Sequence, residues 1–286
     1  MSQHPASTIG VIGAGTMGVG IAYVFAEAGC EVYLVEPDEQ RSTVAVQTIA
    51  ERADRLVGAG RLPSEQSSRI KAALTVRADI GALPRNLDLI VEAVPEVVEL
   101  KHAVLDEAET REPAILATNT SALGIALLAE NLKRPERLIG MHFFNPVWSM
   151  PLLELIKGRG TLAATVEAAE RIGAFIGKET IVVNDVPGFA TSRLGVAIGL
   201  EAIRMVEDGV ASSTDIDRAM ELGYRHPMGP LRLTDLVGLD VRLHIARQLS
   251  QSLGPRFDPP QLLIDKVDRG EIGKKSGRGF FEWEQR

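Results

Sequence analysis

The sequence predicts an α/β fold, in which a doubly wound parallel sheet is followed by an all-helical carboxyl-terminal domain. Short apolar runs alternate with segments of helical periodicity up to residue 184, a pattern typical of a sheet with helices on both faces. A glycine-rich turn follows the first apolar run, and strand-like runs stop after residue 184. We therefore expect two domains, residues 1–184 and residues 185–286, a number that also suits the chain length.

Apolar runs predict the strands, and helical periodicity predicts the segments between them. The strands are expected at Ile9–Ile12, Val32–Val35, Leu87–Val94, Ile115–Ala117, Leu138–His142, Pro151–Ile156 and Thr180–Val183. The helices of the first domain are expected at Thr16–Ala28, Glu39–Val57, Ser64–Ala73, Val97–Thr110 and Ala164–Phe175. Those of the second are expected at Phe189–Glu207, Ser213–Leu222, Leu231–Leu253 and Pro260–Arg269. The apolar surface of so small a helical domain suggests a homodimer.

The turn after the first strand has the spacing of a Rossmann-type dinucleotide site. Gly13 allows the tight turn, Gly15 lets the backbone approach a pyrophosphate, and Gly18 lets the following helix pack close to the sheet. Thr16 and Met17 open that helix, whose unpaired N–H groups and partial positive charge would face the phosphates.

An acidic residue ends the second strand, where the adenosine ribose of a dinucleotide would lie. The carboxylate of Glu36 can accept hydrogen bonds from both ribose hydroxyls. The same carboxylate would repel a 2′-phosphate. The sequence therefore predicts NAD as the cofactor in preference to NADP.

Composition narrows the class of protein further. The net charge of −7 argues against a general nucleic-acid surface, and no apolar run is long enough to span a bilayer. The first six residues lack the basic and apolar regions of a secretory signal, so a cytoplasmic location is expected. Cys30, the single cysteine, is interpreted as a small buried hydrophobe, and no metal site is predicted. A phosphorylated small ligand stays possible near the basic residues Lys71, Lys101, Arg159 and Lys274–Lys275.

Three polar clusters follow predicted strands, at the sheet edge where ligands bind in open α/β folds: Glu92–Glu96, Thr118–Ser121 and Met141–Pro146. The third contains His142. Glu154 lies in an otherwise apolar run, and a buried carboxylate needs a partner because desolvating an ion is costly. A pair of Glu154 with His142 would fix the imidazole tautomer and give a general base near neutral pH. The alternative is that Glu154 lies at a solvated strand edge.

Together these motifs resemble the L-3-hydroxyacyl-CoA dehydrogenase family, especially its 3-hydroxybutyryl-CoA dehydrogenases. The resemblance covers nearly the whole chain, and the histidine-containing and carboxyl-terminal motifs are more specific than the glycine turn. The matching segments are Asn119–Ser121, Met141–Pro146, Glu154, Asp185–Phe189, His226–Pro230, Asp235–Asp240 and Gly273–Phe281.

The resemblance implies an NAD-dependent, reversible oxidation of an (S)-3-hydroxyacyl-CoA to the 3-oxoacyl-CoA. It assigns His142 as the base that takes the proton from the C3 hydroxyl, Glu154 as the residue that holds His142, and Ser121 as a hydrogen-bond partner of the reacting oxygen. It also places five residues beside the cofactor: Glu96, Lys101, Asn119, Asn145 and Lys275.

The sequence departs from the family at one position that the resemblance places in the substrate site. Where the family usually has asparagine before arginine, this chain has Ser192 before Arg193. A serine hydroxyl reaches less far and offers one donor instead of two. Harmless replacement by the hydroxyl or a bridging water is one interpretation, and a reshaped acyl or thioester pocket is the other.

Two other functions stay open at this point. The chain could be an NAD-dependent dehydrogenase of a free hydroxy acid or sugar acid with the same layout. It could also be a non-catalytic NAD-binding protein, although such a protein would need none of Ser121, His142 and Glu154.

Overall fold

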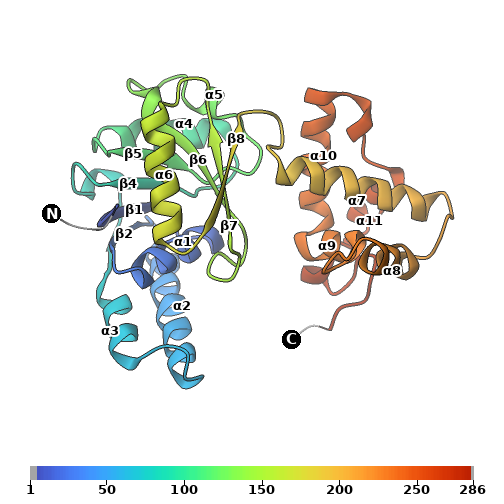
Figure 1. Ribbon diagram of the computed structural model, residues 1–286, viewed down its shortest axis with the longest axis horizontal. Helices are drawn as coiled ribbons and strands as arrows, with labels where there is room; N and C mark the ends of the chain where they lie inside the picture. Colours follow the sequence, from blue (N-terminus) through green and yellow to red (C-terminus); the bar gives the residue numbers. More distant parts are fainter. Residues whose placement is uncertain (1–4, 285–286) are drawn as a thin grey trace. The chain divides into compact units, whose positions relative to one another are not determined.

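The computed structural model describes residues 5–284 and divides into two compact units, Met1–Asp185 and Val186–Arg286. Each unit has its own hydrophobic core. Figure 1 shows that the first unit contains the sheet and that the second is helical. Among residues 5–284, no helix is long and apolar enough to cross a membrane.

The first unit is built on an eight-stranded sheet with the order β3-β2-β1-β4-β5-β6-β7-β8. All neighbouring strands pair in parallel except β6 and β7, which are antiparallel. The strands are β1 (Thr8–Ile12), β2 (Glu31–Val35), β3 (Leu74–Arg77), β4 (Leu89–Glu92), β5 (Ile115–Thr118), β6 (Leu138–Phe143), β7 (Leu152–Lys157) and β8 (Glu179–Asn184).

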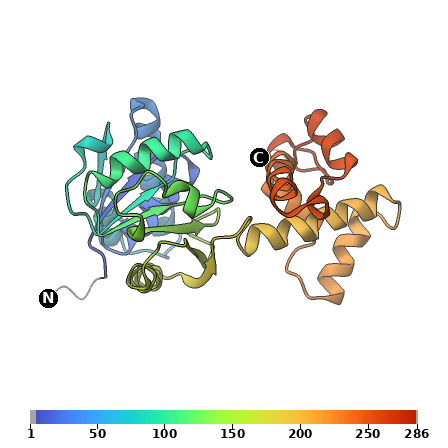
Figure 2. The same ribbon diagram turned by 90° about the horizontal axis from the view of Figure 1, so that it is seen from above.

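Helices cover both faces of this sheet (Figures 1 and 2). They are α1 (Thr16–Glu27), α2 (Glu39–Gly58), α3 (Ser64–Ala72), α4 (Val98–Glu109), α5 (Ile125–Leu128) and α6 (Ala163–Phe175), with short 3-10 turns at η1 (Ile80–Ala82) and η2 (Pro135–Arg137). The apolar sides of α1, α2, α3 and α6 form one continuous core with alternate strand residues such as Ile9 and Val11. The apolar side chains that α4 and α5 bury, which include Leu105, Ile125 and Leu128, lie outside that cluster.

The second unit contains α7 (Thr191–Glu207), α8 (Ser213–Gly223), α9 (Pro230–Val237), α10 (Leu239–Leu253), η3 (Pro255–Phe257), α11 (Gln261–Asp268) and η4 (Lys274–Ser276). Its core gathers fully buried side chains from α7, α9, α10 and α11, for example Leu200, Leu231, Ala246 and Leu263. Between residues 186 and 284 the β structure is limited to isolated bridges.

Three features differ from the sequence prediction. The single helix expected at Leu231–Leu253 is wrong, because Gly238 adopts a φ of 103° and separates α9 from α10. The strand β3 was not predicted, since its four residues are only partly buried at the sheet edge. The sheet is not wholly parallel, because the short link from β6 to β7 cannot hold the long crossover that a parallel pair requires.

Candidate active site

The strand order changes direction between β1 and β4, since β2 and β3 extend from one side of β1 and β5 to β8 from the other. In open α/β sheets such a switch point, at the carboxyl ends of the strands, is where ligands bind. The polar residues that follow β1, β4 and β5, and those at the end of β6, therefore share one edge of the sheet.

The glycine turn at the end of β1 is shaped by close backbone contacts. A Cβ atom on Gly18 would lie 1.8 Å from the carbonyl oxygen of Gly13, and Gly13 itself has a φ of 101°. A Cβ atom on Gly15 would meet nothing within 4 Å. No described side chain caps α1, which begins at Thr16. The amino-terminal N–H groups of α1, including those of Thr16 and Met17, thus adjoin an open space where a phosphate would fit.

Glu36 lies just after β2, beside this turn. It is buried, with 6% of its surface exposed, and its Oε2 accepts a hydrogen bond of 3.2 Å from the backbone N–H of Ala14. Its Oε1 accepts one of 3.2 Å from the N–H of Asp38. The carboxylate is therefore held by the backbone at the place where the sequence predicts contact with a ribose.

His142 and Glu154 are directly opposite each other on the antiparallel strands β6 and β7. Nδ1 of His142 lies 3.0 Å from Oε2 of Glu154, and both side chains are buried. A carboxylate only accepts hydrogen bonds, so Nδ1 of His142 carries the proton, and Nε2 of the neutral ring keeps its lone pair. The ring of Phe144 lies 4.4 Å from the imidazole, centroid to centroid. This geometry suits a proton acceptor that uses Nε2.

The two predicted asparagines occupy different surroundings. Oδ1 of Asn119, directly after β5, accepts a hydrogen bond of 2.9 Å from the N–H of Phe143 and so joins the ends of β5 and β6. Asn145 is exposed in the link between β6 and β7, and a cis peptide bond connects it to Pro146.

Glu96 binds the loop that carries Ser121. Its Oε1 accepts hydrogen bonds from Oγ1 of Thr120 at 2.6 Å, from the N–H of Ser121 at 2.9 Å and from the N–H of Ala122 at 3.1 Å. Burial would raise the pKa of the Glu96 carboxyl, but the charge of Lys101 and these hydrogen bonds outweigh burial and lower the pKa. Glu96 is therefore an ionised acceptor that fixes the position of Ser121.

Lys101 was predicted beside the cofactor, and the structure finds its side chain only 1% exposed. Its Nζ lies 2.7 Å from Oε1 of Glu92, 2.9 Å from Oε2 of Glu92 and 3.3 Å from Oε2 of Glu96. The sequence analysis places Glu92 in a polar cluster at the sheet edge but gives it no individual role, and the structure shows that it ends β4 and is fully buried. The available signal was a carboxylate directly after three apolar strand residues, because a buried charge needs a partner.

Two predicted site residues belong to the second unit. Ser192 lies in the first turn of α7. Lys275 lies in η4, where its Nζ donates a hydrogen bond of 2.6 Å to Oδ2 of Asp240 and its side chain stays 46% exposed.

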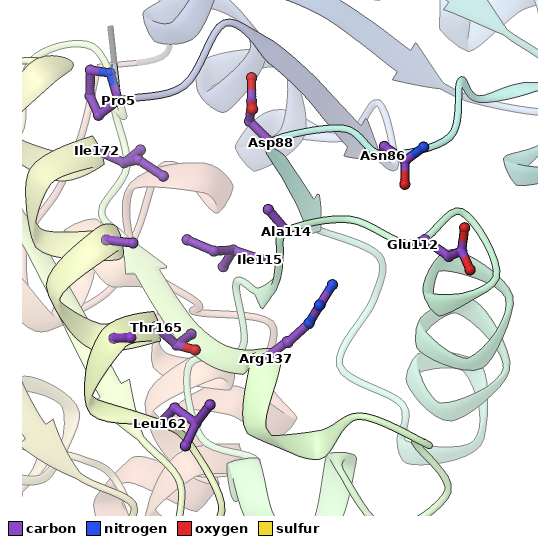
Figure 3. A pocket seen from close by; sticks show the side chains of 12 residues that line it. Pro5, Asn86, Asp88, Glu112, Ala114, Ile115, Arg137, Leu162, Thr165 and Ile172 are labelled. Carbon is purple, nitrogen blue, oxygen red and sulfur yellow. The ribbon is translucent and has the colours of Figure 1, made fainter. Parts of the chain in front are cut away.

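A separate hollow of about 460 Å³ lies at the amino-terminal edge of the sheet (Figure 3). Its charged groups already have partners, because Oδ2 of Asp88 accepts from Thr8, Nη1 of Arg137 donates to the carbonyl of Pro113, and Glu112 pairs with Arg85 at 2.6 Å. None of the predicted site residues lines it. Among residues 5–284, no group of three or more His, Cys, Asp or Glu side chains is arranged to hold a metal ion.

Comparison with known families decides the class of the protein. Residues 8–186 match the model of the 3-hydroxyacyl-CoA dehydrogenase NAD binding domain, and residues 188–283 match the model of the 3-hydroxyacyl-CoA dehydrogenase C-terminal domain. The chain belongs to the 3-hydroxyacyl-CoA dehydrogenase family. Its first unit is thus the NAD-binding domain of an oxidoreductase, as the glycine turn and Glu36 predict.

Several relatives within the 3-hydroxyacyl-CoA dehydrogenase family match along almost their whole length. The 3-hydroxybutyryl-CoA dehydrogenase of Mycobacterium tuberculosis is 42% identical over 283 residues, which cover 96% of this chain and 98% of that protein. The 3-hydroxybutyryl-CoA dehydrogenase of Clostridioides difficile is 37% identical and matches over 96% and 99%. The crystal structure of (S)-3-hydroxybutyryl-CoA dehydrogenase from Ralstonia eutropha is similar with a TM-score of 0.93 and 35% identity, over 98% of this chain and all of that one.

Proposed function

We propose that this chain catalyses the reversible, NAD-dependent oxidation of (S)-3-hydroxyacyl-CoA, with 3-hydroxybutyryl-CoA as its main substrate and His142 as the base. The observation that supports this most is the buried His142–Glu154 pair at the carboxyl edge of the sheet. The short acyl chain follows the names of the relatives in Mycobacterium tuberculosis and Clostridioides difficile.

NAD fits the first unit, because the close Gly13–Gly18 contact lets α1 start directly at the turn and because the open space beside Gly15 would be filled by a larger side chain. Thr16 and Met17 would present backbone N–H groups to the pyrophosphate. The carboxylate of Glu36 would accept hydrogen bonds from the ribose hydroxyls. The chemistry that bound NAD supplies is acceptance of the hydride from C3 of the substrate. We further propose Glu96, Asn119, Asn145 and Lys275 as residues of the cofactor site. Lys101, which is 1% exposed and is bound by Glu92 and Glu96, would support that site through Glu96 and would not touch the cofactor.

Three side chains, those of His142, Glu154 and Ser121, act on the C3 hydroxyl and its proton. Nε2 of His142 takes this proton while the C3 hydrogen leaves as hydride, and Glu154 stabilises the imidazolium that results. The hydroxyl of Ser121 contacts Oε1 of Glu96 at 3.4 Å in this structure and would donate its hydrogen to the reacting oxygen once substrate is bound. The loop that Glu96 holds sets the position of this hydroxyl. In the reverse direction, the imidazolium returns the proton to the oxygen of the 3-oxo group.

The substrate class is tested by reduction of acetoacetyl-CoA and of free acetoacetate at equal concentration, with NADH and with NADPH. We expect turnover of the thioester to exceed that of the free acid by at least about tenfold, and NADH to be preferred. A series of 3-oxoacyl-CoA esters of increasing length then measures the size of the acyl pocket. Equal rates for thioester and free acid would favour the alternative, a dehydrogenase of a free hydroxy acid or sugar acid.

Ser192 is proposed as a substrate-binding residue in the first turn of α7. Restoring the longer amide with Ser192→Asn is expected to change kcat/KM several-fold, because an additional donor reaches the thioester, and to leave the Kd for NADH unchanged. Steady-state kinetics over graded acyl lengths and a fluorescence titration of NADH measure the two quantities. Identical kinetics for every ester would show that Ser192 is not part of the pocket.

We also propose a cytoplasmic homodimer. The second unit exposes large apolar side chains on α7 and near the end of α8, including Leu194 at 63% and Leu222 at 69%. Exposed apolar side chains on so small a domain favour association with a second copy of the chain. Sedimentation equilibrium is expected to give twice the mass of 30.8 kDa, and a monomer at micromolar concentration would contradict the proposal.

A further inference from the structure

The carboxylate of Glu92 is fully buried and makes four hydrogen bonds. Nζ of Lys101 donates to both of its oxygens, Oγ1 of Thr118 donates to Oε2 at 2.6 Å, and the N–H of Val94 donates to Oε1 at 2.6 Å. A buried ion is tolerated only when it is paired and hydrogen-bonded, and these donors meet that need. Glu92 ends β4, Thr118 ends the neighbouring strand β5, and Lys101 lies in α4. The carboxylate therefore joins three elements at the carboxyl edge of the sheet.

Glu92 determines where the ammonium of Lys101 lies. The two contacts with Glu92, at 2.7 and 2.9 Å, are shorter than the contact with the carbonyl of Val94 at 3.2 Å and the contact with Glu96 at 3.3 Å. An ammonium has only three hydrogens, which the two oxygens of Glu92 and the carbonyl of Val94 accept, while Glu96 adds an ion pair. Because the same ammonium contacts Glu96, the position of Glu92 also affects where the carboxylate of Glu96 lies.

Glu96 extends this network to the loop after β5. One oxygen faces Lys101, and the other accepts from Thr120, Ser121 and Ala122. The side chain of Glu96 is 26% exposed, whereas those of Glu92 and Lys101 are at most 1% exposed. The network therefore connects the buried pair of Glu92 and Lys101 to the loop that carries Ser121, at the carboxyl edge of the sheet.

We propose that Glu92 is a positioning residue for the dehydrogenase reaction, which acts through Lys101 and Glu96 to hold the hydroxyl of Ser121 against the reacting oxygen. Glu92 does not touch substrate or cofactor. The inference rests on the proposed function, because it requires that Ser121 contact that oxygen. A misplacement of about 1 Å at a reacting group can cost on the order of 100-fold in rate, so a remote anchor can have a large kinetic effect.

The test is Glu92→Gln, which keeps the shape of the side chain and removes its charge. We expect kcat for acetoacetyl-CoA reduction, at saturating NADH and substrate, to fall about 10- to 100-fold, because Lys101 loses its strongest acceptor. The decisive measurement is a double-mutant cycle with Ser121→Ala. Since Glu92 acts through Ser121, Glu92→Gln is expected to change kcat less than about twofold in the Ser121→Ala background.

Asp88→Asn is the matched control. Oδ2 of Asp88 also accepts three hydrogen bonds, from the N–H groups of Ser7 and Thr8 and from Oγ1 of Thr8, but at the opposite edge of the sheet. This variant is expected to lower Tm while kcat stays unchanged. If Glu92→Gln likewise lowers Tm and keeps kcat, or if its losses add to those of Ser121→Ala, the positioning role is wrong.

Thr118→Val gives the same test with a smaller disturbance, should Glu92→Gln not fold. It removes one hydrogen bond to Glu92 and leaves the ion pair, so we expect a several-fold loss of kcat that again disappears in the Ser121→Ala background. If the losses of kcat from Thr118→Val and Ser121→Ala add, the positioning role of Glu92 is wrong, but the proposed function still stands. Full activity of Ser121→Ala would overturn both the inference and the assigned role of Ser121, and so separates the two failures.

Discussion

Replacing His142 with glutamine is expected to lower kcat by about 10²- to 10⁴-fold, the range that loss of a general base produces. Glutamine fills a similar space and can hydrogen-bond to Glu154, but it cannot take a proton at neutral pH. The hydride transfer would then leave the proton of the C3 hydroxyl without an acceptor. Steady-state oxidation of (S)-3-hydroxybutyryl-CoA, followed by NADH absorbance, measures the loss.

The same substitution at His102 is the control for this variant. His102 lies in α4, and its Nε2 contacts the backbone carbonyl of Leu127 at 2.8 Å. His102→Gln is expected to keep kcat within about twofold. The Kd for NADH should be unchanged in both variants, which separates a chemical defect from loss of cofactor. An unchanged kcat for His142→Gln would reject the assigned base, and it would support the non-catalytic alternative.

Gly18→Ala is expected to destabilise the first unit and to weaken NADH binding more than tenfold. The added Cβ would lie 1.8 Å from the carbonyl oxygen of Gly13, so the turn or α1 has to move. Overpacking of this kind costs about 1–3 kcal/mol or more. The displacement also moves the N–H groups of α1 that would face the pyrophosphate. Chemical denaturation measures the stability, and a fluorescence titration measures the Kd for NADH.

Gly15→Ala is the matched comparison, because its Cβ would meet nothing within 4 Å of the protein. Its stability is expected to change by less than about 0.5 kcal/mol, as is usual for a substitution in open space. NADH affinity should still fall, because the methyl group would occupy the space where the backbone approaches the pyrophosphate. If NADH binds Gly15→Ala and the unaltered protein equally well, the pyrophosphate does not lie at this turn.

The sequence predicted the order of helices and strands because periodicity is a local property. Alternation of apolar runs with helical segments requires no knowledge of which strands pair, and family matching confirms the NAD-binding domain that the Gly13–Gly18 spacing predicts. The spacing is informative because Gly18 packs against the backbone of Gly13, only five residues away, and because Gly13 itself has a φ of 101°. The prediction of a single helix at Leu231–Leu253 was wrong, because a glycine inside a helical pattern does not reveal its backbone conformation. Gly238 has a φ of 103°, and this ends the first of the two helices.

The partnership of His142 and Glu154 could be proposed from the sequence, since an isolated carboxylate in an apolar run needs a partner. The antiparallel register that places them opposite each other required the tertiary structure. Register is set by which strand lies alongside β6, and residues far away in the chain decide that. The sequence likewise could not place the hydroxyl of Ser121, because its position depends on Glu96, 25 residues earlier.

The sequence by itself determined the class of fold, the cofactor and the family, because these depend on short motifs and on apolar periodicity. Only the tertiary structure decided that Lys101 is sealed from solvent and that Glu92 is its main partner. The exposure of a charged side chain is a property of everything packed around it. A lysine on a surface helix and a lysine between a buried and a half-buried carboxylate have the same letter in the sequence, and only their neighbours in space distinguish them.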